Sequence, residues 1–126
     1  MTFVSFIIPV FNEEKVIRLF YDELVRVISR IHIEYEIVFV DDGSIDNTWN
    51  ILESLQSHDN NVRLIGLSRN FGHQAAMLAG IENARGECVI TMDGDLEHPP
   101  EIIPQLIEKW RHGIEVVNTR RHSGRD

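Results

Sequence analysis

The sequence contains a single cysteine, Cys88, among its 126 residues. One thiol can form no internal disulfide, and it lacks the companion thiolates of a structural zinc site. Because Cys88 begins the apolar run at residues 88–90, we expect it to be a core residue rather than a reactive thiol. The stability of the fold must therefore come from its hydrophobic core.

Long apolar stretches are also absent, since none approaches the roughly 20 residues that cross a bilayer. The N-terminus has no basic region followed by an apolar stretch and a small-residue cleavage site. We therefore expect a soluble, cytoplasmic chain. The formal net charge of -8, with Lys15 and Lys109 as the only lysines, argues against a general nucleic-acid surface, which needs clustered basic residues.

The sequence has no internal repeat, low-complexity tract or interdomain linker. A chain of this length, 43% hydrophobic and 25% charged, is typical of one globular domain, residues 1–126. No Gly-x-Gly-x-x-Gly motif follows the first predicted strand, which argues against a dinucleotide-type phosphate loop.

Strands are predicted to alternate with helices along the chain. The predicted strands are residues 3–10, 36–40, 62–67, 87–92 and 114–118. The predicted helices are about residues 16–31, 46–55, 73–84 and 102–110, the second with Asp46 as its N-cap. The apolar stripe of the first helix is Val16, Leu19, Phe20, Leu24, Val27, Ile28 and Ile31. This alternation predicts an α/β fold with a mainly parallel sheet and helices on both faces.

Polar residues cluster where four of the predicted strands end. Because ligands of open parallel sheets bind at the carboxyl ends of the strands, these clusters favour a binding site on one edge. The clusters are Asn12-Glu13, Asp41-Asp42, Arg69-Asn70 and Asp93-Gly94-Asp95.

Asp93 and Asp95 can face one bound cation, because side chains two apart on an extended chain point to the same side. Carboxylate oxygens suit a hard divalent ion such as Mg2+ or Mn2+. The alternative is a solvated turn in which the two aspartates bond to nearby backbone.

The ordered motifs resemble those of family 2 glycosyltransferases, over almost the whole chain. Asp93-Gly94-Asp95-Leu96-Glu97, followed by Pro99-Pro100-Glu101 and Arg121, is more narrowly similar to the polyprenyl-phosphate sugar transferases. These include bactoprenol glucosyltransferases and dolichol-phosphate mannose synthases. The other matching motifs are Pro9-Val10-Phe11-Asn12-Glu13, Asp41-Asp42-Gly43-Ser44 and Arg69-Asn70-x-Gly72. The resemblance implies the GT-A fold, a Rossmann-like nucleotide-sugar-binding fold.

The resemblance assigns Pro9, Phe11 and Glu13 to the base and ribose of a nucleotide sugar. It places Asp41 or Asp42 on the same portion, where a carboxylate can accept hydrogen bonds from hydroxyls. The alternative for these two aspartates is an Asx-type turn with helix capping, with Gly43 providing the bend. For Glu13 the alternative is a favourable charge at a helix N-terminus.

The resemblance also assigns Asp93 and Asp95 to Mg2+ or Mn2+ on the diphosphate, with Glu97 as a further metal or water contact. Arg121 resembles an arginine near the acceptor phosphate.

Arg69 has a planar guanidinium that could meet a phosphate or form a structural ion pair. His73 begins a helix and is expected to be a surface or capping residue. Trp49 and Trp110 fall on apolar helical stripes and are expected to pack in the core.

The implied reaction transfers a sugar, with inversion, from a donor of the UDP-glucose or GDP-mannose class to a polyprenyl phosphate. The alternative acceptor is a sugar hydroxyl, whose proton a carboxylate would have to remove. The chain ends at Asp126, whereas the resembling enzymes continue with acceptor-binding segments and membrane helices. We therefore expect the nucleotide-binding part of such an enzyme, competent to bind metal and nucleotide but poor in catalysis. It would contact a membrane only through a missing C-terminal segment.

Two alternatives remain open. One is a catalytically silent nucleotide-binding or interaction fragment of the same kind of enzyme. The other is a phosphoryl-receiver signalling domain, which would place its acidic pair after the first strand and a lysine after the fifth. Here the pair Asp41-Asp42 follows the second predicted strand, and arginines follow the fifth.

Overall fold

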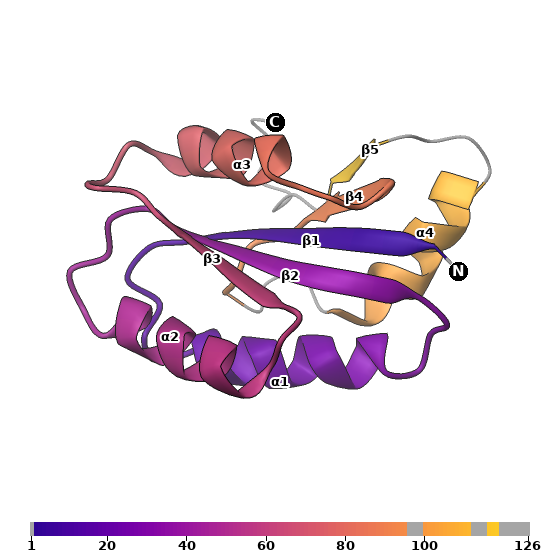
Figure 1. The fold of residues 1–126 in the computed structure, drawn as a ribbon, viewed down its shortest axis with the longest axis horizontal. Helices are drawn as coiled ribbons and strands as arrows, with labels where there is room; N and C mark the ends of the chain where they lie inside the picture. Colours follow the sequence, from indigo (N-terminus) through magenta and orange to yellow (C-terminus); the bar gives the residue numbers. More distant parts are fainter. Residues whose placement is uncertain (1, 96–99, 112–115, 119–126) are drawn as a thin grey trace.

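The computed structural model describes residues 2–95, 100–111 and 116–118. They form a five-stranded parallel sheet with helices on both faces (Figure 1). The strand order is β3-β2-β1-β4-β5. The strands are β1 (Phe3–Val10), β2 (Glu34–Asp41), β3 (Val62–Gly66), β4 (Cys88–Thr91) and β5 (Val116–Asn118). The helices are α1 (Ile17–Ile28), α2 (Thr48–His58), α3 (His73–Glu82), the short 3-10 helix η1 (Pro100–Ile102) and α4 (Ile103–Arg111).

The predicted α/β class and the order of its elements are confirmed. Most boundaries agree to within one or two residues, while the first two predicted helices differ from α1 and α2 by up to three. The predicted last strand began at Ile114, which lies outside the described residues. Within the described ranges, every helix is too short or too polar to span a lipid bilayer.

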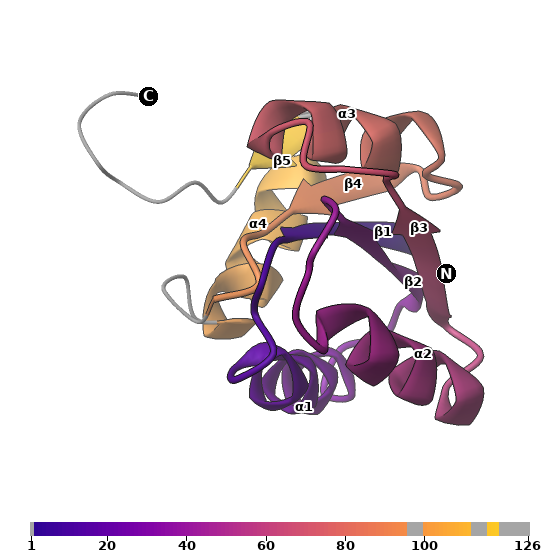
Figure 2. The ribbon, with the colours of Figure 1, turned by 90° about the vertical axis from the view of Figure 1, so that its left-hand side faces the viewer.

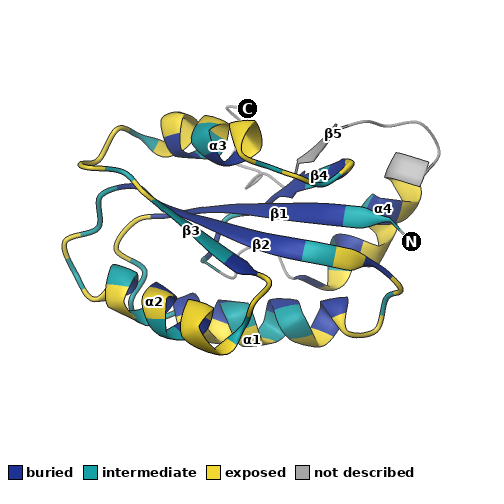
Figure 3. Cartoon of the chain, in the orientation of Figure 1, coloured by how far each residue is buried: buried dark blue, intermediate teal, exposed yellow. Residues whose placement is uncertain are grey.

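The central strand β1 separates two cores because neighbouring side chains of a strand point to opposite faces. Phe6 and Ile8 face the larger core, which α1, α2 and α4 cover, while Ile7 faces the smaller core beneath α3. Figure 3 shows β1 and β2 buried along most of their length between these layers. Cys88 is fully buried in the larger core, as expected.

Helix α3 packs closely on the sheet at Gly80. A Cβ on its Gly80 would lie 2.4 Å from Cγ2 of Ile7, a separation that real side chains do not reach. Gly80 therefore lets the backbone of α3 pack directly on β1.

Two local predictions were wrong. Leu19 was assigned to the buried stripe of the first helix, but its side chain is 54% exposed, because the sheet covers only one side of α1. Asp46 was predicted as an N-cap, yet α2 begins at Thr48 with Asn47 in the cap position. The carboxylate of Asp46 instead accepts the backbone N–H of Thr48 at 2.9 Å, the local bond of an Asx turn.

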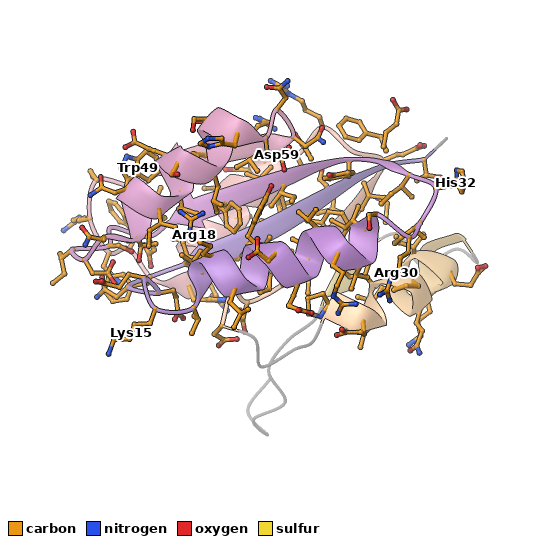
Figure 4. All side chains as sticks on the ribbon, turned by 90° about the horizontal axis from the view of Figure 1, so that it is seen from below. Lys15, Arg18, Arg30, His32, Trp49 and Asp59 are labelled. Carbon is orange, nitrogen blue, oxygen red and sulfur yellow. The ribbon has the colours of Figure 1, made fainter. Side chains whose placement is uncertain are left out.

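Helices α1 and α2 lie side by side beneath the sheet (Figure 4). The hydroxyl of Tyr21 on α1 donates a 2.5 Å hydrogen bond to Asp59 at the end of α2. Trp49 packs against the larger core, and a Cβ on Gly66 of β3 would lie 3.1 Å from its ring. The core role expected for Trp49 is confirmed, whereas the side chain of Trp110 lies outside the described part.

The buried carboxylate of Glu36 connects the strands in the amino-terminal half of the sheet. It accepts hydrogen bonds from Ser5 Oγ (2.6 Å), Arg63 Nη1 (2.6 Å) and the backbone N–H of Arg85 (2.7 Å). Burial alone would raise the pKa of Glu36, but these hydrogen bonds outweigh it and hold the pKa below its ordinary value. Glu36 therefore joins β1, β2, β3 and the turn before β4 as a charged group.

We predict that Glu36→Gln lowers the free energy of unfolding by about 2–3 kcal/mol, because an amide leaves buried donors without their charged acceptor. The pKa of Glu36 is lowered from 4.5 on folding, so its contribution is fully present above about pH 4.5 and is lost as the pH falls through the folded-state pKa. Urea unfolding of both proteins across this range measures the difference.

The matched control is Glu34→Gln on the same strand, where the side chain is exposed. It should leave stability nearly unchanged. An equal loss in both variants, or a loss for Glu36→Gln that does not shrink in acid, would contradict this account of Glu36.

Candidate functional site

The parallel strands bring their carboxyl ends to one edge of the sheet, which faces the viewer in Figure 2. Val10 at the end of β1 pairs with Asp41 at the end of β2, and Thr91 at the end of β4 pairs with Ile7. The four polar clusters predicted from the sequence follow β1, β2, β3 and β4. The expectation that they share one edge is confirmed.

Hydrogen bonds join the loops after β1 and β2 into one unit. Asn12 donates its backbone N–H to Ser44 Oγ at 2.8 Å, while its side-chain oxygen accepts the N–H of Ile45 at 2.9 Å. The N–H of Glu13 donates to Thr48 Oγ1 at 2.9 Å. Asn12 has a positive φ of 52°, which asparagine tolerates better than most residues. These bonds fix the first loop against the start of α2.

The residues predicted to contact a base lie on this unit with different exposures. Pro9 is buried within β1, opposite Val40 of β2. Phe11 is 43% exposed at the rim, and Glu13 is half-buried beside it. Phe11 is therefore one of the exposed apolar side chains at this edge, together with Ile45 after β2 and Phe71 after β3.

The neighbouring carboxylates of Asp41 and Asp42 have different partners. Asp41 Oδ1 accepts the N–H of Ser44, three residues further on, at 3.0 Å, a local turn bond of the kind considered as an alternative. Asp42 accepts the N–H groups of Phe71 at 2.8 Å and Gly72 at 3.0 Å. Both side chains are nearly fully buried. Because each carboxylate oxygen has two lone pairs, these bonds still leave acceptor capacity for a ligand.

Gly43 lets the loop after β3 approach this turn. Its φ is +74°, and a Cβ there would lie 2.3 Å from the carbonyl carbon of Arg69. The two loops therefore touch through their backbones. The bend expected at Gly43 is present, and it serves this close approach.

Arg69 lies exposed at the rim. Its guanidinium carbon is 4.6 Å from the centre of the Phe71 ring, a cation–π contact. Within the described part of the chain, Arg69 forms no ion pair. The ion pair considered for Arg69 is thus not formed there, and the stacking leaves its charge at the rim.

Asp93 and Asp95 follow β4 in the turn at residues 93–95. The buried Gly94 between them packs on β1, since a Cβ there would lie 2.9 Å from Cγ1 of Val10 and 3.1 Å from Cγ2 of Ile8. This contact holds the backbone of the turn against the sheet. Both aspartate side chains are half-buried.

His73, the first residue of α3, places Nε2 2.7 Å from Oδ1 of Asp93. His73 was expected to have only a surface or capping role, so this contact was missed. The signal in the sequence was the position of His73 at the start of the helix that follows the loop after β3, but the strand order was needed to bring it to Asp93. Glu97 and Arg121, two other predicted site residues, lie outside the described residues.

Carboxylates are the donors that Mg2+ and Mn2+ prefer, so Asp93 and Asp95 fit such an ion. In the described residues, no three His, Cys, Asp or Glu side chains gather into a metal-binding group. A site with few protein ligands fits Mg2+, which keeps several waters and binds together with substrate phosphates.

Residues 5–126 match the family model described as Glycosyl transferase family 2. The chain is 42% identical over 124 residues to undecaprenyl-phosphate 4-deoxy-4-formamido-L-arabinose transferase of Proteus mirabilis, covering 98% of the chain and 38% of that protein. It is 42% identical over 118 residues to the prophage bactoprenol glucosyl transferase homolog of Escherichia coli, covering 94% and 39%. The chain spans less than two fifths of the length of these curated relatives.

The chain is also similar to solved structures. The complex of Staphylococcus aureus TarS 1-349 with UDP-GlcNAc is 32% identical, with a TM-score of 0.61 over 75% of this chain and 27% of TarS. Pyrobaculum calidifontis mannosyltransferase PcManGT, in complex with GDP-Man and Mn2+, is 24% identical, with a TM-score of 0.69 over 85% and 31%. The second match concerns the fold alone.

We predict that Asp42→Asn loosens the loop after β3, because an amide keeps one acceptor oxygen but turns an N–H2 group toward a backbone N–H. The free energy of unfolding should fall by about 1–3 kcal/mol. Backbone amide exchange at Phe71 and Gly72 should accelerate, which NMR hydrogen exchange measures. Asp22→Asn, at an exposed position of α1, is the control. Unchanged exchange at Phe71 and Gly72 would contradict the role of Asp42.

Proposed function

The chain belongs to glycosyltransferase family 2 and has the GT-A fold, and from this premise we propose that it binds a nucleoside-diphosphate sugar at the carboxyl edge of its sheet. The observation that carries the proposal is the position of Asp93 on the same edge as the loops after β1, β2 and β3. A bound molecule can therefore meet a polar rim and a carboxylate pair together.

The nucleotide end of the donor is assigned to the loops after β1 and β2. Phe11 offers an exposed aromatic face to a base, and the carboxylates of Glu13, Asp41 and Asp42 can accept hydrogen bonds from ribose hydroxyls. The complex of TarS with UDP-GlcNAc supports a nucleotide sugar as the ligand class. We propose a donor of the UDP-glucose or GDP-mannose class.

Asp93 and Asp95 would hold Mg2+ or Mn2+ against the diphosphate. When bound, such an ion neutralises the charge that develops on the departing nucleoside diphosphate. The chain itself supplies the carboxylates, a turn held by Gly94 against β1 and the exposed cation of Arg69 on the loop after β3. Glu97 remains a proposed further contact.

The proposed acceptor is a polyprenyl phosphate, the class that the name of the Proteus mirabilis relative states for that protein. Its monophosphate is largely dianionic near pH 7, because the second pKa of a phosphate monoester is about 6. A phosphate oxygen can then attack the anomeric carbon without a protein base. The new C–O bond forms as the bond to the nucleoside diphosphate breaks on the opposite side, so the configuration inverts. Arg121 is the proposed contact for the acceptor phosphate.

We predict that the chain binds UDP or GDP, and the matching UDP-glucose or GDP-mannose, more tightly with Mn2+ than without it. Asp93→Ala/Asp95→Ala should lose more than about 10-fold in affinity in the presence of Mn2+, because the ion loses its ligands. Isothermal titration calorimetry with the four nucleotides measures both effects.

The control for this titration is Glu53→Gln, which removes one negative charge from an exposed position of α2. It should bind like the wild type. Circular dichroism establishes that each variant is folded. A folded wild-type chain that binds none of the four nucleotides would refute the proposed function, and metal-dependent binding that survives the double substitution would refute the assignment of the two aspartates.

The acceptor is tested by comparing polyprenyl monophosphate with polyprenol of the same chain length, using the radiolabelled donor that binds. We predict that labelled lipid, at the low yield expected of the nucleotide-binding part alone, forms only with the monophosphate, because an alcohol needs a general base to remove its proton. Equal labelling of both lipids would contradict a phosphate acceptor.

A further inference from the structure

We propose that His73 is a positioning residue that orients the carboxylate of Asp93 for the cation and diphosphate, an inference that rests on the proposed function. His73 begins α3 and Asp93 follows β4, so twenty residues of chain separate them. Their contact links the helix on one face of the sheet to the candidate metal site at its edge.

The direction of the hydrogen bond follows from the chemistry of its two groups. A carboxylate only accepts, so the 2.7 Å contact requires a hydrogen on Nε2 of His73. Both the neutral Nε2–H tautomer and the imidazolium satisfy this. His73 thereby engages Oδ1, which leaves Oδ2 as the oxygen that would meet a cation. Such outer contacts fix the orientation of metal ligands and raise metal affinity.

His73 is itself held from its N-terminal side. The carboxylate of Asp42 binds the N–H groups of Phe71 and Gly72, the two residues before it. Gly72 has a φ of +107°, a conformation that glycine adopts without strain, and its carbonyl accepts the N–H of Ala76. A chain of contacts therefore runs from β2 through Asp42 and His73 to Asp93.

The C-terminal side of His73 is fixed by the close packing of Gly80 on Ile7. The imidazole, in contrast, is 52% exposed. A half-exposed ring buries little apolar surface, so core packing is a weak reason for its position. Its defined contact is the one with Asp93, whose side chain is 20% exposed.

The experiment compares His73→Ala, His73→Gln and the control Gln74→Ala, an exposed neighbour on α3. Mn2+ is titrated into each protein alone and with saturating UDP or GDP, whichever binds the wild type. His73→Ala should weaken Mn2+ binding on the order of 10-fold. His73→Gln keeps an N–H donor and should restore most of the affinity, while Gln74→Ala should match the wild type.

Thermal unfolding without metal separates positioning from stability. Because the ring is half-exposed, the metal-free melting temperature of His73→Ala should stay close to that of the wild type. Wild-type affinity for Mn2+ in His73→Ala would overturn the inference and leave the proposed function standing. Affinity in His73→Gln as low as in His73→Ala would also overturn it, since a donated hydrogen bond would then not be what matters. A wild type that binds neither Mn2+ nor nucleotide would overturn both proposals.

Discussion

The parallel pairing of β1 with β2 on one side and β4 on the other is the constraint on which the rest of the structure depends. Parallel strands need long crossovers, and these supply the helices that bury both faces of the sheet. The same alignment sends every strand toward one edge. Loops that are far apart in sequence therefore meet there, and the candidate site is a direct consequence of this arrangement.

Buried carboxylates secure the fold at both edges of the sheet, but they do so differently. In the amino-terminal half of the sheet, Glu36 accepts hydrogen bonds from three different segments of the chain. It lies toward the opposite end of the strands from the candidate site. At the carboxyl edge, Asp42 fixes the loop that leads into α3. Because each buried charge has hydrogen-bond partners, it stabilises rather than strains its surroundings. Asp93 is less buried than Glu36 and Asp42, so its carboxylate is the most accessible of the three to a ligand.

The acidic character of the edge fits the proposed chemistry only with a cation. A diphosphate approaching Asp41, Asp42 and Asp93 meets like charge, which is unfavourable in a partly buried site. A divalent ion held by Asp93 and Asp95, as proposed above, would turn this repulsion into attraction. Arg69 carries positive charge at the rim, and His73 holds one oxygen of Asp93. With such an ion, the acidic edge would suit an anionic donor.

The sequence by itself determined the alternation of strands and helices and the clustering of polar residues at strand ends, because both depend on local periodicity and turn chemistry. It also determined the family, through motifs read in order. Only the tertiary structure decided that Asp41 closes a local turn while Asp42 reaches the loop before α3, and that Leu19 faces solvent. It alone brought His73 to Asp93, since the strand order β3-β2-β1-β4 requires α3 to cross the sheet. Contacts between distant segments depend on strand order and packing, which no local pattern encodes.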